Sequence, residues 1–329
     1  MADHSAAARS APRRHARAWA VPVAGLIALT GCSVSSPDAG TDAVGTAPQA
    51  ISQFEHVHGL GADPLTGHTY AATHQGVWRI PTSAIPDSYL AGAPRSTVTE
   101  PEQIAGRAMD AMGFTVAAPG LLLASGHPDP TEHLDLALPN LGLVSSTDAA
   151  HTWTALSLQG ETDFHSLEAV ALNDASLRVY GYDAGSGTVS VSDDSGLTWE
   201  QGASLALRDL AADPAHPDEV FATTADGLAV SVDAGRTFAL LPAAPPLLLV
   251  DTVDAASGGG LVGIDPNGTL WRQEAATETW VQTGTLTGVP EAFSFIGGDS
   301  PWIIAANAEG ITASQDFGVS WTVLTSLTE

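Results

Sequence analysis

The chain has 329 residues, with 11 Lys and Arg against 37 Asp and Glu, and a formal net charge of −26 at pH 7. After residue 32 it contains seven Arg and no Lys. Such a surface excludes nucleic acid, which is bound through clustered cations, and disfavours anionic lipid headgroups. The single cysteine, Cys32, excludes disulfides and thiolate metal sites from the rest of the chain.

Residues 1–31 have the organisation of an export signal. Four arginines between residues 9 and 17 precede an apolar run from Ala18 to Leu29, which is too short to span a bilayer. Twin arginines in the basic head leave the twin-arginine export route open as an alternative. Leu29-Thr30-Gly31-Cys32 resembles the lipobox of bacterial lipoproteins, which implies that Cys32 is lipidated and becomes the mature N-terminus. The resemblance predicts an extracytoplasmic protein, lipid-anchored to the outer face of the cell membrane.

The segment that follows the lipobox has the composition of a flexible tether. Residues 33–50 are small, polar and free of aromatic side chains, so they cannot bury a hydrophobic core. We expect residues 32–50 to be the lipidated cysteine and its tether. Residues 51–329 are then predicted to form one domain.

A repeat with a period near 40 residues runs through 51–329 and indicates a β-propeller. Each unit contains two short strands and then a glycine with an apolar residue that opens a third strand. The opening glycines are Gly76, Gly142, Gly187, Gly227, Gly268 and Gly310. We therefore expect an all-β fold, a six-bladed β-propeller of four-stranded antiparallel blades. The long first interval leaves room for a seventh blade between Pro81 and Arg107.

A second motif follows four of the third strands: a serine, an aspartate two residues later, and an aromatic residue five positions beyond it. The aspartates are Asp148, Asp194, Asp233 and Asp316, and the aromatic residues are Trp153, Trp199, Phe238 and Trp321. An aspartate in this position can accept hydrogen bonds from its own turn, and the aromatic ring can pack between blades. We interpret these residues as structural. The motif resembles the Asp-box (BNR) repeat of sialidase-like propellers and sortilin, which implies the same class of fold.

Histidines gather on one face of the predicted propeller. The loops that enter each first strand and those that join second to third strands share one face, here called the top face. Six of the nine histidines after residue 32 fall there, all in the first three blades: His56, His58, His74, His127, His133 and His165. The same loops carry four aspartates, Asp110, Asp129, Asp163 and Asp183. The connection from residue 125 to 142 is also long, as binding loops often are.

Imidazoles and carboxylates gathered in one pocket can bind Zn²⁺, Cu²⁺ or Mn²⁺ through nitrogen and oxygen atoms. The predicted ligand or metal residues are His56, His58, His74, His127, Asp129 and His165. Two alternatives stay open from the sequence: a polar pocket without metal, and histidines that are hydrogen-bonded structural residues at strand ends.

Segments outside the turns carry a further resemblance. Residues 56–60 (HVHGL), 72–76 (ATHQG) and 125–130 (SGHPDP) look like bacterial secreted proteins labelled as glycosyl hydrolases. The resemblance implies a hydrolase, for which Asp129 and Asp163 are the candidate catalytic carboxylates. Sialic-acid hydrolysis itself is disfavoured, because few arginines can reach the centre of the top face.

Three functions follow from these features. The first is a surface propeller that binds a small-molecule or metal ligand at the top face of blades 1–3. The second is a glycoside hydrolase acting on glycans of the cell envelope. The third is a protein-assembly platform, like the sortilin and photosystem-assembly propellers.

Overall fold

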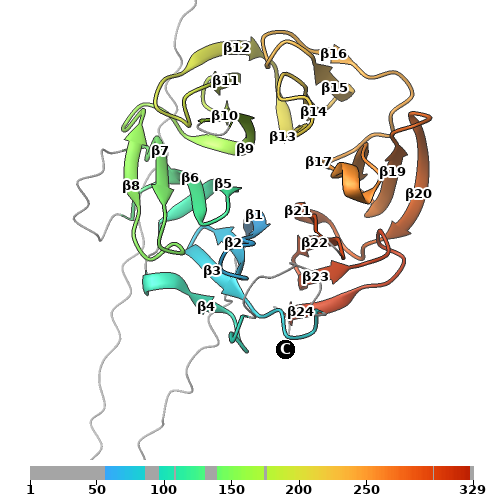
Figure 1. Cartoon of the computed structure of the whole chain (residues 1–329), viewed down its shortest axis with the longest axis horizontal. Coiled ribbons are helices and arrows are strands. Elements are labelled where there is room, and N and C mark those ends of the chain that lie inside the picture. Colours follow the sequence, from blue (N-terminus) through green and yellow to red (C-terminus); the bar gives the residue numbers. More distant parts are fainter. Residues whose placement is uncertain are drawn as a thin grey trace, which may run out of the picture. The chain divides into compact units, whose positions relative to one another are not determined.

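The computed structural model describes residues 56–85, 96–106, 109–129, 139–173, 176–298 and 300–326. These residues belong to one compact unit and form 24 strands in six antiparallel sheets of four, with no α-helix among them. The sheets are the blades of a propeller arranged around a central axis (Figure 1). The predicted six-bladed fold is confirmed. The predicted signal peptide, Cys32, the tether and His133 lie outside the described residues.

Each blade is built from four consecutive strands, numbered from the axis outwards (Figure 1). Blade 1 contains β1 (Val57–Ala62), β2 (Thr69–Thr73), β3 (Gly76–Ile80) and β4 (Glu102–Gln103). Blade 2 contains β5 (Asp110–Ala118), β6 (Leu121–His127), β7 (Leu143–Ser146) and β8 (Thr154–Ser157). Blade 3 contains β9 (Phe164–Asn173), β10 (Ser176–Asp183), β11 (Thr188–Ser192) and β12 (Glu200–Ser204).

The second half of the ring repeats this plan. Blade 4 contains β13 (Leu207–Ala212), β14 (Val220–Thr224), β15 (Gly227–Ser231) and β16 (Ala239–Leu240). Blade 5 contains β17 (Leu249–Thr252), β18 (Leu261–Ile264), β19 (Thr269–Glu274) and β20 (Thr279–Thr285). Blade 6 contains β21 (Pro290–Ile296), β22 (Trp302–Asn307), β23 (Gly310–Ser314) and β24 (Thr322–Ser326).

The third strands begin where the repeat glycines predict. Gly76, Gly227 and Gly310 are the first residues of β3, β15 and β23, and the other three repeat glycines directly precede their strands. The ring closes with six blades, because β1 packs against both β5 and β21. The alternative of a seventh blade is therefore wrong: the segment expected to hold it supplies β4, which completes blade 1.

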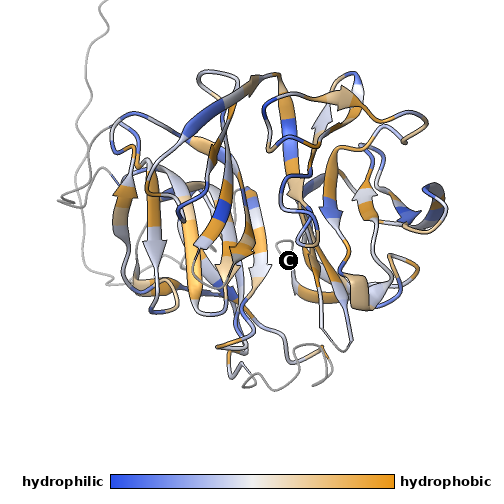
Figure 2. Ribbon diagram, turned by 45° about the horizontal axis from the view of Figure 1, so that its top comes forward, coloured by the Kyte–Doolittle hydropathy of each residue, from blue (hydrophilic) through white to orange (hydrophobic). Residues whose placement is uncertain are grey.

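The hydrophobic core lies between the blades. The described residues contain six buried clusters, and each joins two neighbouring blades. The strands carry most of the apolar residues, whereas many connecting loops are hydrophilic (Figure 2). Alternate residues of each strand can face one neighbour, so a twisted stack of small sheets buries apolar side chains on both faces.

The serine–aspartate turns after the third strands share one pattern of hydrogen bonds. In blade 3, Asp194 accepts hydrogen bonds from the Ser192 hydroxyl at 2.8 Å and from the Thr198 N–H and hydroxyl at 2.8 and 2.6 Å. Bonds from the threonine hydroxyl and N–H lower the pKa of Asp194 to about 2. The Trp199 indole N–H donates to Ser157 of blade 2 at 2.9 Å. The turn therefore ties its aromatic residue to the preceding blade.

Candidate functional site

Side chains from blades 1, 2 and 3 form a continuous chain of contacts across the top face. Each comes from the end of a strand or from the loop beside it, which is why the propeller brings them together. The members are His58 in β1, His74 between β2 and β3, Asp110 at the start of β5, His127 at the end of β6, Asp163 just before β9, and His165 in β9. We call these six residues the top-face chain.

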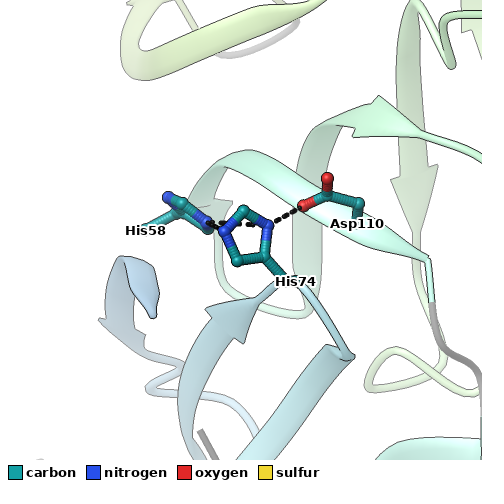
Figure 3. A group of neighbouring side chains, drawn as sticks. All are labelled: His58, His74 and Asp110. Atoms are coloured by element: carbon teal, nitrogen blue, oxygen red, sulfur yellow. Dashed lines mark hydrogen bonds and ion pairs between the residues drawn. The ribbon is translucent and has the colours of Figure 1, made fainter. Parts of the chain in front are cut away.

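The first half of the chain is the group formed by His58, His74 and Asp110 (Figure 3). One nitrogen or oxygen atom from each lies within 4.8 Å of the others. The His58 and His74 rings stand almost at right angles, with 4.4 Å between their centroids. Their Nε2 atoms are 3.3 Å apart, and His74 Nδ1 lies 2.8 Å from Asp110 Oδ1. Each residue is partly buried.

The protonation of this group follows from its contacts. A carboxylate only accepts hydrogen bonds, so His74 donates through Nδ1–H to Asp110. Burial and the neighbouring His74 lower the pKa of His58 to about 4. His58 is therefore neutral at pH 7. This is the state that metal binding requires.

The second half of the chain contains His127, Asp163 and His165. His165 Nε2 lies 2.8 Å from Asp163 Oδ2, and that contact raises the pKa of His165. His127 stands between two carboxylates, with Nδ1 3.5 Å from Asp110 Oδ2 and Nε2 3.5 Å from Asp163 Oδ2. Asp110 therefore faces a histidine with each of its oxygens and links the two halves.

Two glycines allow the strands that carry these residues to approach closely. Gly126, beside His127, has φ of +140°, and a Cβ atom there would lie 1.9 Å from the carbonyl oxygen of Asp110. A Cβ at Gly113 would lie 2.4 Å from the carbonyl oxygen of Phe164, which is flanked by Asp163 and His165. Larger residues would push the site apart, so glycine is required here for packing and, at Gly126, for backbone conformation.

The remaining predicted site residues lie around this chain. His56 has a 61% exposed side chain whose Nδ1 is 3.6 Å from Glu291 Oε1 in blade 6, and its ring centroid is 5.7 Å from that of His74. Asp129 is buried, and among the described residues it does not belong to the group of possible metal ligands formed by His58, His74 and Asp110. Asp183 accepts a hydrogen bond from Gly185 N–H at 2.8 Å within its own turn.

A cavity of about 520 Å³ lies on the propeller axis below the top-face chain. Residues of all six inner strands line it, including His58 and His165. Four carboxylates that sequence reasoning missed also line it: Glu168, Asp209, Asp251 and Glu291. Burial raises the pKa of Asp209 to about 6 and that of Asp251 to about 7. Burial and these two neighbours raise the pKa of Glu168 well above its usual range.

These carboxylates also connect inner strands that do not pair as one sheet. Asp209 accepts from Val250 N–H at 3.0 Å, and Asp251 accepts from Phe295 N–H at 2.7 Å. Asp209 and Asp251 are the third residues of β13 and β17, and they are 42 positions apart in the sequence. That interval matches the period near 40 residues, and it is the signal by which they could have been found.

A second group of possible metal ligands lies in the β13–β14 loop, at the opposite end of blade 4 from the top face. It contains Asp213, His216 and Glu219, all within one seven-residue turn. His216 Nδ1 lies 2.8 Å from Asp213 Oδ2, and the His216 side chain is 72% exposed. An exposed group built within one local turn has much less pre-organisation than the top-face chain.

No protein-family model matches this chain, and no curated protein matches it. The described residues contain no helix long and apolar enough to cross a membrane. Similar solved structures include a chain of the nidogen/laminin complex, with 14% identity, a TM-score of 0.53 and coverage of 76% of this chain and 89% of that one. The WD40 β-propeller domain of Doa1 has 12% identity, a TM-score of 0.51 and 82% coverage of both chains. A GH74 xyloglucanase from Xanthomonas campestris has 17% identity and a TM-score of 0.47 over 84% of this chain, which spans 46% of the enzyme. At these identities the likeness shows the fold alone, and that fold is a β-propeller.

Proposed function

We propose that this propeller binds a divalent metal ion on its top face through His58 and His74, with Asp110 orienting His74. The observation that carries the proposal is the 3.3 Å distance between the two Nε2 atoms. Ligand atoms bound tetrahedrally at about 2.0–2.1 Å from Zn²⁺ lie roughly 3.3 Å apart. The two Nε2 atoms therefore have the spacing of a ligand pair. His58 Nε2 also lies 3.4 Å from His74 Nδ1, so binding requires a ring rotation that aims both Nε2 lone pairs at the ion.

The contact between His74 and Asp110 supports the same reading. Metal-binding histidines usually donate their second N–H to a carboxylate, which fixes the ring and raises its basicity. Asp110 does this from a neighbouring blade, at 2.8 Å from His74 Nδ1. His56, with its ring 5.7 Å from His74, is in a position to supply a third imidazole. Nitrogen ligands of this kind favour Zn²⁺ or Cu²⁺ over harder cations.

Titration of chelator-treated protein with Zn²⁺, followed by calorimetry and elemental analysis, tests the proposal. We expect saturable binding that is lost in His58→Ala and His74→Ala and is weakened about 10–100-fold in Asp110→Asn, as for other carboxylates that orient a ligand. His151→Ala is the matched control, because His151 is an exposed histidine in a serine–aspartate turn. Binding that survives both His58→Ala and His74→Ala would contradict the proposal.

A hydrolytic function is a second candidate, and the axial cavity is the observation that favours it. Glycosidases use two carboxyl groups, one of which holds a proton near neutral pH. Asp209 and Asp251 line one cavity and have raised pKa values. They suit this role better than the predicted pair, because neither Asp129 nor Asp163 lines the cavity and Asp163 contacts His165 at 2.8 Å. Loss of glycan hydrolysis in Asp251→Asn, with folding retained, would support this function.

We further propose that the propeller is displayed outside the cytoplasm on a lipid attached to Cys32. Support comes from the basic head, the short apolar run and the lipobox-like residues that precede this cysteine. The serine–aspartate turns support assignment to the Asp-box class of propellers found among secreted proteins. Labelling with an alkyne fatty acid tests the anchor: Cys32→Ser is expected to lose both the label and membrane association, and a labelled Cys32→Ser would overturn it.

A further inference from the structure

The distances within the top-face chain divide into two kinds. The contacts of His74 with Asp110 and of His165 with Asp163 are 2.8 Å, which is the length of a hydrogen bond. The contacts of His127 with Asp110 and with Asp163 are both 3.5 Å. Hydrogen bonds to a charged carboxylate are shorter, about 2.7–2.9 Å, whereas atoms that share a metal ion are commonly about 3.3 Å apart.

Asp163 contains an oxygen that the protein does not satisfy. Its Oδ1 atom is buried and has no hydrogen-bond partner, and its side chain is only 14% exposed. A buried carboxylate oxygen without a donor is costly, and such a group calls for an unseen cation, proton or water. The other oxygen, Oδ2, faces imidazole nitrogens of both His127 and His165.

From these observations we propose a second divalent-metal position, formed by His127 Nε2, Asp163 and His165 Nε2. It rests partly on the proposed function, because Asp110 would orient a ligand of each position. Asp110 Oδ1 accepts a hydrogen bond from His74, and Asp110 Oδ2 faces His127 Nδ1. Both histidines therefore turn Nε2 away from the carboxylate that they share. Asp163 is the fixed ligand. The ligand atoms of the three residues do not all lie within 4.8 Å of one another, as those of His58, His74 and Asp110 do. Binding therefore turns the His127 and His165 side chains, which are 43% and 36% exposed, towards Asp163.

Binding at this position exchanges a proton for a cation. In the free protein His165 Nε2–H donates to Asp163 Oδ2 at 2.8 Å. The incoming ion forms bonds to both atoms, and the Nε2 proton is replaced: a neutral ring becomes the Nδ1–H tautomer, and a charged ring also releases one proton to solvent. The ligand set contains two imidazoles and one carboxylate, so Zn²⁺ and Mn²⁺ are the chemical class expected.

The test is the number of ions bound per chain, measured by elemental analysis after equilibration with Zn²⁺ and removal of excess ion. We expect two ions in the wild type, one in Asp163→Asn, one in His58→Ala and none in the double variant. The His165→Ala variant removes a second ligand of the same metal position. Circular dichroism verifies that each variant is folded. A Co²⁺ titration adds a readout independent of stoichiometry, because each position contributes its own visible absorption band.

The matched control is the Asp213–His216 pair in blade 4, which has the same 2.8 Å contact as Asp163–His165. His216→Ala is expected to leave the count at two. A second ion lost in His216→Ala and kept in Asp163→Asn would overturn the inference and place that ion in the β13–β14 loop.

The outcomes separate the two proposals. One ion that His58→Ala removes and Asp163→Asn leaves would sustain the proposed function and refute the second position. One ion with the opposite behaviour would refute the proposed function and sustain the second position. A wild type without any bound ion would refute both.

Discussion

Replacing Gly126 by alanine should distort the top-face site by separating the two strands, β5 and β6, that carry Asp110 and His127. The added Cβ atom would lie 1.9 Å from the Asp110 carbonyl oxygen and 2.9 Å from Met112 N. Real Cβ atoms keep at least about 3 Å from such atoms, so β5 and β6 must separate by roughly 1 Å. The φ angle of +140° adds strain, because only glycine adopts it readily.

The size of the effect follows from these two contributions. The unfavourable φ costs about 1–3 kcal/mol and overpacking about 1–3 kcal/mol, so we expect a loss of roughly 2–6 kcal/mol in the free energy of unfolding. The same movement displaces Asp110 and His127 from each other. Zn²⁺ affinity should therefore fall about 10–100-fold, as it does when an orienting carboxylate is lost.

Gly187→Ala is the comparison that isolates packing from backbone strain. Gly187 also has a positive φ, +66°, but a Cβ atom there would meet nothing within 4 Å. Its replacement should cost only about 1–2 kcal/mol and leave Zn²⁺ binding unchanged. Urea unfolding monitored by tryptophan fluorescence, with calorimetric Zn²⁺ titration, measures both variants. Equal stability losses and equal affinities in the two variants would refute the reasoning.

Three further predictions concern the scaffold. Asp194→Ala removes the acceptor of the blade 3 turn and should lower the free energy of unfolding by about 2 kcal/mol, seen as a lower urea midpoint. Arg178→Met removes a bidentate pair with Asp193, at 2.6 and 3.0 Å, and should cost about 1–2 kcal/mol by thermal denaturation, since the exposed aspartate regains water. Asp251 has a pKa of about 7 when folded, against an ordinary value of 3.8, so its contribution to stability is full below pH 4 and declines as pH rises towards 7. The melting temperature should fall less steeply between pH 5 and pH 8 in Asp251→Asn, and an unchanged slope would contradict this assignment.

The fold was predictable because each blade repeats the same physical requirements. A strand that must start beside its neighbour's turn uses a glycine, and β3, β15 and β23 begin at such residues. The blade count was less certain from sequence, because the first interval contains enough residues for additional strands. Packing of β1 against β21 decided the number, and contact between distant segments is invisible in a local pattern.

The sequence predicted which residues lie together on the top face, but not which of them contact one another. Strand direction alone determines which end of a blade a loop occupies, so the histidines could be assigned to one face. The partner of each imidazole depends on side-chain rotation and on how closely β5 approaches its neighbours. That is why the sequence assigned Asp110, Asp129 and Asp163 to the same face but selected Asp129 as the ligand, whereas the described contacts run through Asp110 and Asp163.

The sequence did not identify the cavity carboxylates as site residues, for a different reason. Asp209 and Asp251 stand within apolar inner strands, where a lone acidic residue looks like an ordinary interruption. Only alignment of the blades reveals that both occupy the third position of their strands. Their buried surroundings then arise from the closing of the ring, which no single blade encodes.

Glu291 adds polar contacts to the junction of blades 1 and 6, which an apolar cluster already joins and which the polypeptide itself does not cross. In the described residues the chain passes from each blade to the next, but blades 6 and 1 meet without a connecting segment. Glu291 accepts the Val57 N–H at 3.2 Å and faces His56, while Arg208 donates to its backbone carbonyl at 2.8 Å. These contacts connect blade 6 to the start of blade 1, beside His58. An ion bound to His56 and His58 would add a further link beside this junction. Binding on the top face would then also raise the free energy needed to separate blades 6 and 1.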